Sequence, residues 1–208
     1  MIKVRHLRTI FLWRWFNVAL MATKGVRLSP SSVLNGSASA FKLFAGVKIN
    51  ARCKLQVSYP GRLRLGENVW LSSDVEMETA SLIDIGEGST IQRRVTINGT
   101  VTLGVGCILA PNVFISSGTH PFREFGELPI REQERLIIAK EGSLSSLDRK
   151  VDIGDDCWLG VNAVICPGVT VGKGSVIGAN SVVTTDIPQY SIAVGAPAKV
   201  VGSRLATR

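Results

Sequence analysis

The chain has 208 residues, a formal net charge of +8, two histidines and four cysteines. Its length predicts one domain with a single sizeable core. The cysteines form no CxxC pair, so neither a zinc site nor a disulfide framework is indicated, and a cytoplasmic location is expected. The basic residues are not interleaved with a recognisable nucleic-acid-binding module, so nucleic acid is not an expected partner.

The positive charge is concentrated in the first third of the chain. Residues 1–66 hold half of the 24 Lys and Arg residues and no acid, because Glu67 is the first acidic residue. This distribution favours an anionic partner, such as a lipid headgroup, a phosphorylated substrate or an acidic patch on a protein. A solvated basic face is the alternative interpretation.

Residues 1–44 are expected to form a basic, partly helical N-terminal segment. Its apolar run from Ile10 to Met21 is interrupted by Arg14 and Asn17, and no clear small-residue cleavage site follows, so a secretory signal is not indicated. The run is also too short to span a bilayer, which needs roughly 20 apolar residues. Two interpretations stay open: an amphipathic helix packed on its own protein, or a helix that lies on the inner surface of the membrane.

From residue 85 onward the sequence repeats every six residues. Aliphatic residues occupy the first position of every hexad in two blocks, at Ile85, Ile91, Ile97, Leu103, Leu109 and Ile115, and then at Ile153, Leu159, Ile165, Val171, Ile177 and Val183. The fifth position is mostly small, and the second is often glycine, where a corner needs either positive φ or close backbone approach. A helix cannot place a period of six on one face. The pattern predicts a solenoid of short strands and turns in which each aliphatic residue stacks on its counterpart about 18 positions later.

The same pattern recurs in a weaker form toward the N-terminus, at Ile49, Leu65 and Leu71. The solenoid is therefore expected to span residues 45–188, followed by a C-terminal tail at 189–208. Residues 121–152 interrupt it, because they are polar and show no hexad. A loop of this length that leaves a compact solenoid is usually functional.

Three strings of the sequence carry a more specific signal than the bare repeat. They are ILAPNVFISSGTHPF at 108–122, DIGDDCWLGVNAVICPGVTVGKGSVIGANSVVTTDIP at 152–188 and VGAPAKVV at 194–201. Together they resemble the hexapeptide-repeat acyltransferases, within the branch of galactoside, maltose and polysaccharide O-acetyltransferases. The resemblance implies an all-β fold, a left-handed parallel β-helix, with acetyl-CoA as the donor and a homotrimer whose active sites lie between subunits.

His120 matches the catalytic histidine of that family. A neutral imidazole suits removal of a proton from a sugar hydroxyl or amine as that group attacks the thioester carbonyl. The family also uses a backbone amide just after its WxG segment to stabilise the oxyanion, which here is the amide of Val161. Either Glu124 or Glu127 is expected to orient the imidazole, and the sequence does not choose between them.

The resemblance also implies residues that bind acetyl-CoA. Trp158 and Gly160, in the WLG segment, resemble positions beside the pantetheine arm, with an apolar surface residue as the alternative role of Trp158. Ala179 resembles a position whose backbone approaches the cofactor. Lys199 and Arg204 are candidate ligands of the phosphates, and Lys173 is a further candidate.

The acceptor site is less well specified. The galactoside branch places an asparagine about two coils before its histidine, and here Gln92 and Asn98 lie in the corresponding stretch. Arg93 and Arg94, in the same stretch, are candidates to recognise a carboxylate or phosphate on the acceptor. Solvent-facing corner residues are the alternative interpretation of these two arginines.

The expected function is transfer of an acetyl group from acetyl-CoA to a hydroxyl of a saccharide, in surface polysaccharide biosynthesis, with His120 as general base. The alternative is N-acetylation of an amino sugar carried on a nucleotide, with the same base and donor. A zinc lyase resembling γ-carbonic anhydrases needs three histidine ligands, and the chain has two histidines, so no metal is expected. A non-catalytic hexad scaffold is the remaining hypothesis.

Overall fold

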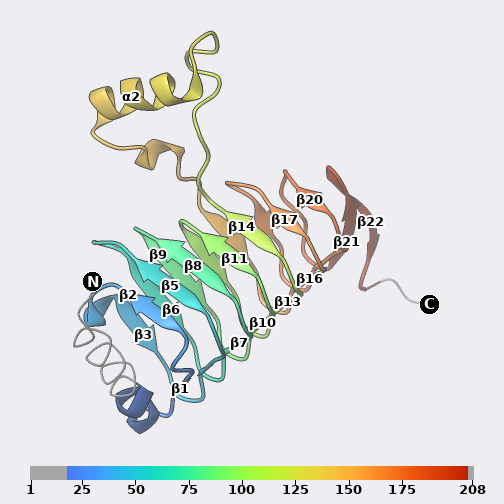
Figure 1. Ribbon diagram of the computed structural model, residues 1–208. Helices are drawn as coiled ribbons and strands as arrows, with labels where there is room; N and C mark the ends of the chain where they lie inside the picture. Colours follow the sequence, from blue (N-terminus) through green and yellow to red (C-terminus); the bar gives the residue numbers. More distant parts are fainter. Residues whose placement is uncertain (1–17, 206–208) are drawn as a thin grey trace.

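A computed structural model describes residues 18–205 and shows a parallel β-helix with three flat sides (Figure 1). Each coil contributes one strand to each of three sheets, called A, B and C here. Sheet A contains β1 (Arg27–Leu28), β4 (Lys48–Ile49), β7 (Trp70–Leu71), β10 (Thr90–Ile91), β13 (Ile108–Leu109), β16 (Trp158–Leu159), β19 (Val176–Ile177), β21 (Ser191–Gly195) and β22 (Ala198–Ser203). Sheet B contains β2 (Val33–Asn35), β5 (Lys54–Val57), β8 (Glu76–Thr79), β11 (Thr96–Asn98), β14 (Phe114–Ser116), β17 (Val164–Ile165) and β20 (Val182–Val183). Sheet C contains β3 (Phe41–Leu43), β6 (Arg62–Leu65), β9 (Leu82–Ile85), β12 (Val101–Leu103), β15 (Val151–Ile153) and β18 (Thr170–Val171).

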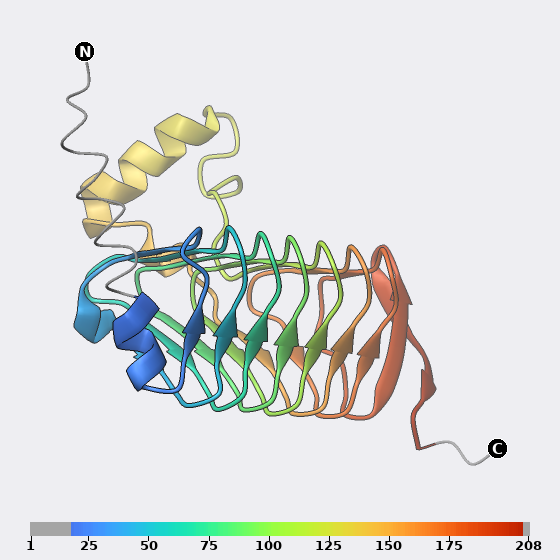
Figure 2. The same ribbon diagram turned by 60° about the horizontal axis from the view of Figure 1, so that its bottom comes forward.

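The aliphatic residues of the hexads form the core. Ile85, Ile97 and Leu109 have no exposed surface, and the other first-position residues of the two blocks are buried as well. The register also follows the repeat, since Ile91 pairs with Leu109 of the next coil in sheet A. The strands stack along the whole length of the solenoid (Figure 2). The predicted core column is therefore confirmed.

The β-helix begins at Arg27, earlier than the expected residue 45. Leu28 pairs with Ile49, and Ile49 with Leu71, so the first coil already has the same register as the later ones. The N-terminal coils are longer than three hexads, because strands such as β5 and β6 have four residues each with alternating burial. In these strands, buried residues alternate with exposed ones instead of recurring every six positions. The hexad pattern therefore predicts a start of the solenoid that is too late.

The C-terminal residues also differ from the expected tail. β21 continues sheet A by pairing with β19, and β22 turns back and pairs with β21 in antiparallel fashion. At the opposite end, residues 18–23 are helical. The rest of the predicted amphipathic run lies outside the described residues. Within residues 18–205, no helix is long and apolar enough to cross a bilayer.

Glycine in the second position of the hexad is needed for close approach of the coils rather than for positive φ. A Cβ on Gly104 would lie 2.5 Å from the backbone nitrogen of Asp155, which is closer than real Cβ atoms come. The left-handed residue is instead the fourth of the hexad, as at Asn112 (φ 63) and Asn162 (φ 60). Asparagine tolerates this conformation, and the two side chains bond from coil to coil, since Nδ2 of Asn112 donates to Oδ1 of Asn162 at 2.9 Å.

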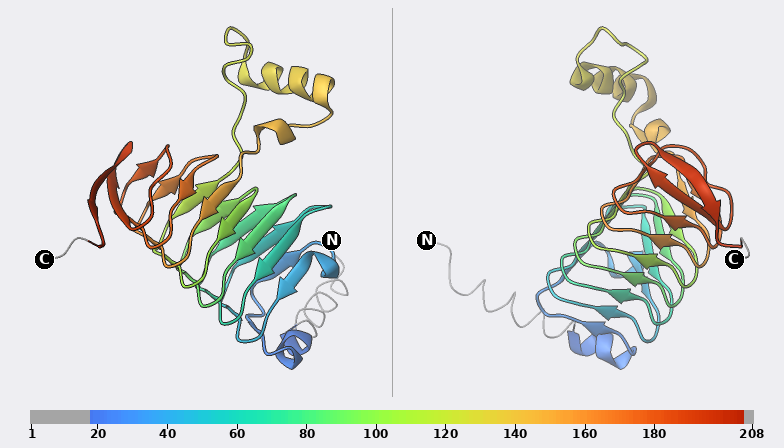
Figure 3. Two further views of the ribbon diagram at one scale, coloured as in Figure 1. Left: turned by 180° about the vertical axis from the view of Figure 1, so that it is seen from behind. Right: turned by 90° about the vertical axis from the view of Figure 1, so that its right-hand side faces the viewer.

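An arm of residues 117–150 leaves the solenoid between β14 and β15 and projects from the corner of sheets B and C (Figure 3). It contains α2 (Ile130–Glu141) and a short 3-10 turn (Ser145–Leu147). Gly142 ends α2 with φ 80, and its amide donates to the carbonyl of Ile138. The sequence pattern does not predict this helix, because its apolar residues form no continuous stripe. Ile130, Leu136 and Ile138 are exposed. Gln133, Glu134 and Ile137 are buried.

Candidate active site

The root of the arm is closed by hydrogen bonds between its two ends. The Oγ of Ser117, on the outgoing side, contacts Oδ1 of Asp148 on the returning side, and the backbone amide of Arg149 donates to the carbonyl of Ser117 at 2.9 Å. Thr100, one coil earlier, donates from its amide to Oγ of Ser117 at 2.6 Å and from its hydroxyl to Oδ2 of Asp148 at 2.5 Å. The arm therefore leaves the solenoid in a defined direction.

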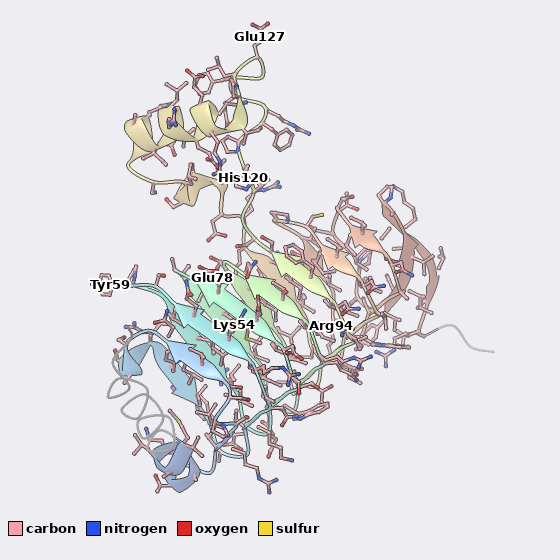
Figure 4. All side chains as sticks on the ribbon, viewed as in Figure 1. Lys54, Tyr59, Glu78, Arg94, His120 and Glu127 are labelled. Carbon is pink, nitrogen blue, oxygen red and sulfur yellow. The ribbon has the colours of Figure 1, made fainter. Side chains whose placement is uncertain are left out.

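His120 lies on the outgoing side of this root, between the end of β14 and α2 (Figure 4). Its side chain is 67% exposed, so the ring is open to a substrate. Its Nδ1 lies 2.5 Å from Oε1 of Glu134. This contact determines which ring nitrogen remains available for chemistry.

Glu134 is the acidic partner of the histidine, in place of the expected Glu124 or Glu127. Its side chain is only 9% exposed, and its other carboxylate oxygen, Oε2, accepts a hydrogen bond of 2.8 Å from Nη1 of Arg131. The guanidinium of Arg131, and after it the imidazole of His120, hold the pKa of the Glu134 carboxyl below its ordinary value. Glu127 lies at the far tip of the arm (Figure 4). No sequence signal separates Glu134 from the other acids of the arm, because the path of the arm and the rotation of α2 decide which acid faces the ring.

Val161 and Trp158 lie at the other end of the sheet B strands. Val161 belongs to the corner between β16 and β17, and Trp158 to β16 just before it, whereas His120 follows the far end of β14, a neighbour of β17. Trp158 is 52% exposed and pairs in register with Ile108, which is also exposed, so an apolar strip runs along the outside of sheet A. Within residues 18–205, the Val161 amide donates no hydrogen bond. A single chain does not bring His120 and this amide together.

The candidate residues for the CoA phosphates fall into two groups. Lys199 is exposed on β22, and Lys173 is also exposed, with its Nζ 3.9 Å from Oδ2 of Asp155. Arg204 is already occupied, because its Nη1 lies 3.0 Å from Oδ2 of Asp156 and donates to the carbonyl of Gly174 at 2.7 Å. Nη1 of Arg204 thus ties the residues after β22 to the corner between sheets C and A.

Gly160 and Ala179 lie against each other at the corner between sheets A and B, which contains Val161. A Cβ on Gly160 would lie 2.6 Å from the backbone nitrogen of Ala179, so the second-position glycine here serves the approach of two coils. The proximity of the two backbones is a structural requirement whether or not a ligand binds there. The backbone of Ala179 lies at the edge of this corner, beside Val161. The carbonyl of Val161 accepts a hydrogen bond of 2.8 Å from the Asn180 amide.

The candidate acceptor residues are split between the two ends of sheet B. Asn98 pairs with Ser116 in register and therefore lies one coil from the strand that leads to His120. Gln92, Arg93 and Arg94 precede β11 and lie at its other end, as the labelled Arg94 shows (Figure 4). Nε of Arg94 donates to Oδ1 of Asn112 at 2.8 Å, which places this arginine in the same column of corner residues that contains Asn162, beside Val161.

Sequence reasoning missed Glu78, which is the next residue in register beyond Asn98. It is exposed, it accepts a hydrogen bond of 2.9 Å from Nε2 of Gln56, and it lies at the same end of sheet B as His120 (Figure 4). Coil length hides this alignment in the sequence, because the coils before residue 85 are longer than three hexads.

Comparison with known proteins gives a consistent result. A family model described as the hexapeptide repeat of succinyl-transferase matches residues 150–185. The galactoside O-acetyltransferase of Escherichia coli (strain K12) is 37% identical over 139 residues, which are 66% of this chain and 62% of that protein. The putative colanic acid biosynthesis acetyltransferase WcaF of the same strain is 26% identical over 182 residues, 86% of this chain and 81% of that protein. The crystal structure of a maltose O-acetyltransferase from Clostridium difficile 630 superposes with a TM-score of 0.52 at 27% identity, covering 67% of this chain and 68% of that one.

The stacked hexads form a left-handed parallel β-helix. The expected fold class is therefore confirmed. The chain contains the hexapeptide repeat and is similar to the O-acetyltransferases named above. It spans less than two thirds of the length of the galactoside O-acetyltransferase that it matches. Within the described residues, no group of three His, Cys, Asp or Glu side chains is placed to hold a metal ion.

Proposed function

We propose that the protein transfers an acetyl group from acetyl-CoA to a hydroxyl of a saccharide. The observation that carries this proposal is the contact between Nδ1 of His120 and Glu134, which leaves Nε2 of an exposed imidazole as the open basic atom. Nε2 takes the proton of the acceptor hydroxyl while the hydroxyl oxygen attacks the thioester carbonyl carbon. The new C–O bond forms, the C–S bond breaks, and the CoA thiolate leaves and is protonated.

The oxyanion of the tetrahedral intermediate needs a preorganised donor, and we assign this role to the Val161 amide. This amide donates to no described residue, but it lies at the opposite end of sheet B from His120 of the same chain. The complete site therefore requires two chains, with His120 from one and the corner of Val161 from the other. A closed homotrimer is the proposed assembly, since a cyclic arrangement makes every such pair equivalent.

Acetyl-CoA is proposed to bind along the corner that contains Val161. The exposed Trp158 and Ile108 offer an apolar surface to the pantetheine arm, and the backbones of Gly160 and Ala179 line the neighbouring turns. Lys199 is the proposed phosphate ligand, with Lys173 as a second cation. Arg204 serves first as a structural tie, because its Nη1 is already bonded to Asp156 and Gly174.

The acceptor is proposed to lie on the outside of sheet B, next to His120. Asn98 supports this placement from the same chain, since an amide both donates to and accepts from sugar hydroxyls. The corner that a second chain would contribute contains Gln92, Arg93 and Arg94. Any contact of these residues with an acceptor or donor beside His120 would therefore cross the subunit interface. The relatives named for galactoside, maltose and colanic acid acetylation support a saccharide, including a unit of a surface polysaccharide.

The test is to incubate the purified protein with acetyl-CoA and each of three acceptor panels, and to follow the release of free thiol. The panels are neutral glycosides, oligosaccharide units of surface polysaccharides, and nucleotide-linked amino sugars. The proposal expects turnover with a neutral or polysaccharide-derived acceptor and an alkali-labile ester in the product. Turnover restricted to nucleotide-linked amino sugars, with an amide product, would overturn it in favour of N-acetylation, and thiol release with none of the panels would contradict both.

We further propose that the protein works in the cytoplasm and that its N-terminal end binds an anionic membrane surface. Two cations of the second coil are neutralised by the third, in the 2.7 Å pairs of Arg52 with Asp74 and Arg64 with Asp84. By contrast, four exposed cations nearer the N-terminal end of the solenoid have no ion pair with any described residue; they are Lys24, Arg27, Lys42 and Lys48. Beside them is a cavity of about 590 Å³ with a largely apolar lining that includes Leu20, Met21, Val33 and Phe41. Basic residues around an apolar surface suit anionic headgroups and their acyl chains.

Co-sedimentation of the full chain with vesicles tests this membrane contact. Binding to vesicles that contain phosphatidylglycerol, but not to pure phosphatidylcholine, is expected, with loss in high salt. Reversal of Lys24, Arg27 and Lys48 to Glu should abolish the binding, whereas Lys140→Glu on α2 serves as the control and should bind as the wild type does. Equal binding by the triple variant would overturn the proposal.

A further inference from the structure

We propose that Glu134 is a positioning residue for His120, which holds the imidazole in one tautomer and stabilises its protonated form during turnover. The inference rests on the proposed function, because it assigns a role to Glu134 in the same reaction. It starts from the distance of 2.5 Å between Nδ1 of the ring and Oε1 of the carboxylate. The two residues are 14 positions apart in the sequence, and only the fold of the arm brings them together.

The direction of the hydrogen bond follows from the chemistry of the two groups. An ionised carboxylate accepts hydrogen bonds and cannot donate them, so Nδ1 carries the proton and Nε2 keeps its lone pair. Nε2 is the ring nitrogen that Glu134 does not contact, on a side chain that is 67% exposed. The base is therefore ready before the acceptor arrives.

Arg131 ensures that Glu134 is the ionised partner. A carboxyl group that is 9% exposed pays a desolvation cost in its charged form, which favours protonation. The bond of 2.8 Å from Nη1 of Arg131 outweighs this cost, and the pKa of Glu134 lies below its ordinary value. Among the described residues, the groups in contact with the carboxylate are thus Arg131, from the same helix, and His120 from the outgoing side of the arm. A protonated Glu134 would donate to Nδ1 and place the ring proton on Nε2, which is the wrong tautomer for a base.

The arm holds Glu134 at the ring through its own packing. Ile137 is buried one turn further along α2, and Nε2 of Gln133 donates to the carbonyl of Leu128 at 2.8 Å, which fixes the start of the helix. The hydrogen bonds of Asp148 at the root orient the arm as a whole. When Nε2 takes the acceptor proton, the imidazolium forms directly against a fixed carboxylate, so the charge develops where its partner already lies.

The decisive experiment is 15N NMR of the ring nitrogens combined with kinetics of Glu134→Gln. The chain has two histidines, so a His6→Gln background leaves a single imidazole to observe. In this background at pH 8, the proton is expected on Nδ1, whereas free histidine in water prefers it on Nε2. Glu134→Gln removes the charge and offers both a donor and an acceptor, so the ring should lose its preference for Nδ1. A wild-type ring protonated on Nε2, or a tautomer unchanged by Glu134→Gln, would overturn the inference even if the enzyme is active.

The kinetic signature separates positioning from a structural role. We expect Glu134→Gln to lower kcat by about 100-fold with the KM for acetyl-CoA within about twofold. Glu132→Gln, two residues away and exposed, is the matched control and should leave kcat and the ring tautomer as in the wild type. A loss of activity that tracks only a lower melting temperature, with the ring tautomer unchanged, would show that Glu134 merely braces the arm. If no acceptor is turned over at all, the NMR result still decides the role of the pair.

Discussion

Thr100 and Asp148 are 48 positions apart in the sequence, and the hydroxyl of Thr100 donates to Oδ2 of Asp148 at 2.5 Å. Asp148 also accepts from Ser117, so one carboxylate joins the solenoid, the start of the arm and its end. His120 follows Ser117 by three residues, and its direction depends on this junction. The geometry of the site therefore depends on a residue that does not contact the histidine.

Asp148→Ala should damage both stability and activity. It leaves the hydroxyls of Thr100 and Ser117 without their acceptor, which costs about 1–3 kcal/mol of unfolding free energy. Because the root loosens, kcat should fall by at least about tenfold. Urea unfolding and initial rates measure the two effects, and Ser146→Ala, at an exposed position of the arm, is the control. An Asp148→Ala protein with wild-type stability and rate would contradict the role of this junction.

His120→Asn should abolish turnover while the donor still binds. Without an imidazole no group removes the acceptor proton, so kcat should fall by about 10²–10⁴-fold. Isothermal titration with acetyl-CoA should give a Kd close to that of the wild type, because the proposed donor surface lies at another corner. His6→Gln provides the control for loss of a histidine. Retained turnover in His120→Asn would refute the general base, and a scaffold function would predict no change in any measured property.

Gly86→Ala should destabilise the fold by overpacking. A Cβ at this position would lie 2.4 Å from the carbonyl carbon and oxygen of Gly104 in the next coil, so the coils must separate. Overpacking of this kind costs about 1–3 kcal/mol of unfolding free energy. Gly118→Ala is the matched control, because a Cβ there meets no atom within 4 Å. Denaturant unfolding distinguishes the two, and equal midpoints would show that the coils adjust without cost.

The exposed pair of Arg52 and Asp74 should give a small, pH-dependent contribution to stability. The guanidinium of Arg52 holds the pKa of Asp74 below its ordinary value. Because the pKa is lower in the folded protein, the contribution is complete above about pH 4 and is lost as the pH falls through the folded pKa. Asp74→Asn keeps a residue that tolerates φ 62, and should lower Tm by at most about 2 °C at pH 7. The difference from the wild type should vanish at low pH and in 1 M NaCl, and a difference that grows on acidification would reverse the assigned sign.

The uneven charge of the sequence has a partly internal explanation. Residues 1–66 contain no acid, yet Lys54 bonds Glu76 at 2.6 Å and Arg64 bonds Asp84 at 2.7 Å. Stacking brings together residues about one coil apart, so a basic coil followed by an acidic coil neutralises itself. The sequence alone does not show that the basic and acidic stretches are neighbours in space, because the coil length that aligns them is known only from the fold.

Local periodicity alone determined the core of this protein. Aliphatic residues at every sixth position must share one side of a short strand, so the column from Ile85 to Val183 follows without knowledge of any distant contact. The motif around His120 likewise marks the histidine through its neighbours in the chain. Both properties are carried by residues close in sequence, and the structure confirms the core column.

Only the tertiary structure decided which group contacts that histidine and where the other candidate site residues lie. Glu134 rather than Glu124 or Glu127 meets the ring, Arg204 is used as a tie, and Val161 lies across sheet B from His120. Each of these depends on the path of a long arm or on the alignment of coils of unequal length. Such alignments are set by the sum of packing and hydrogen bonds over the whole chain, which no short stretch of sequence contains.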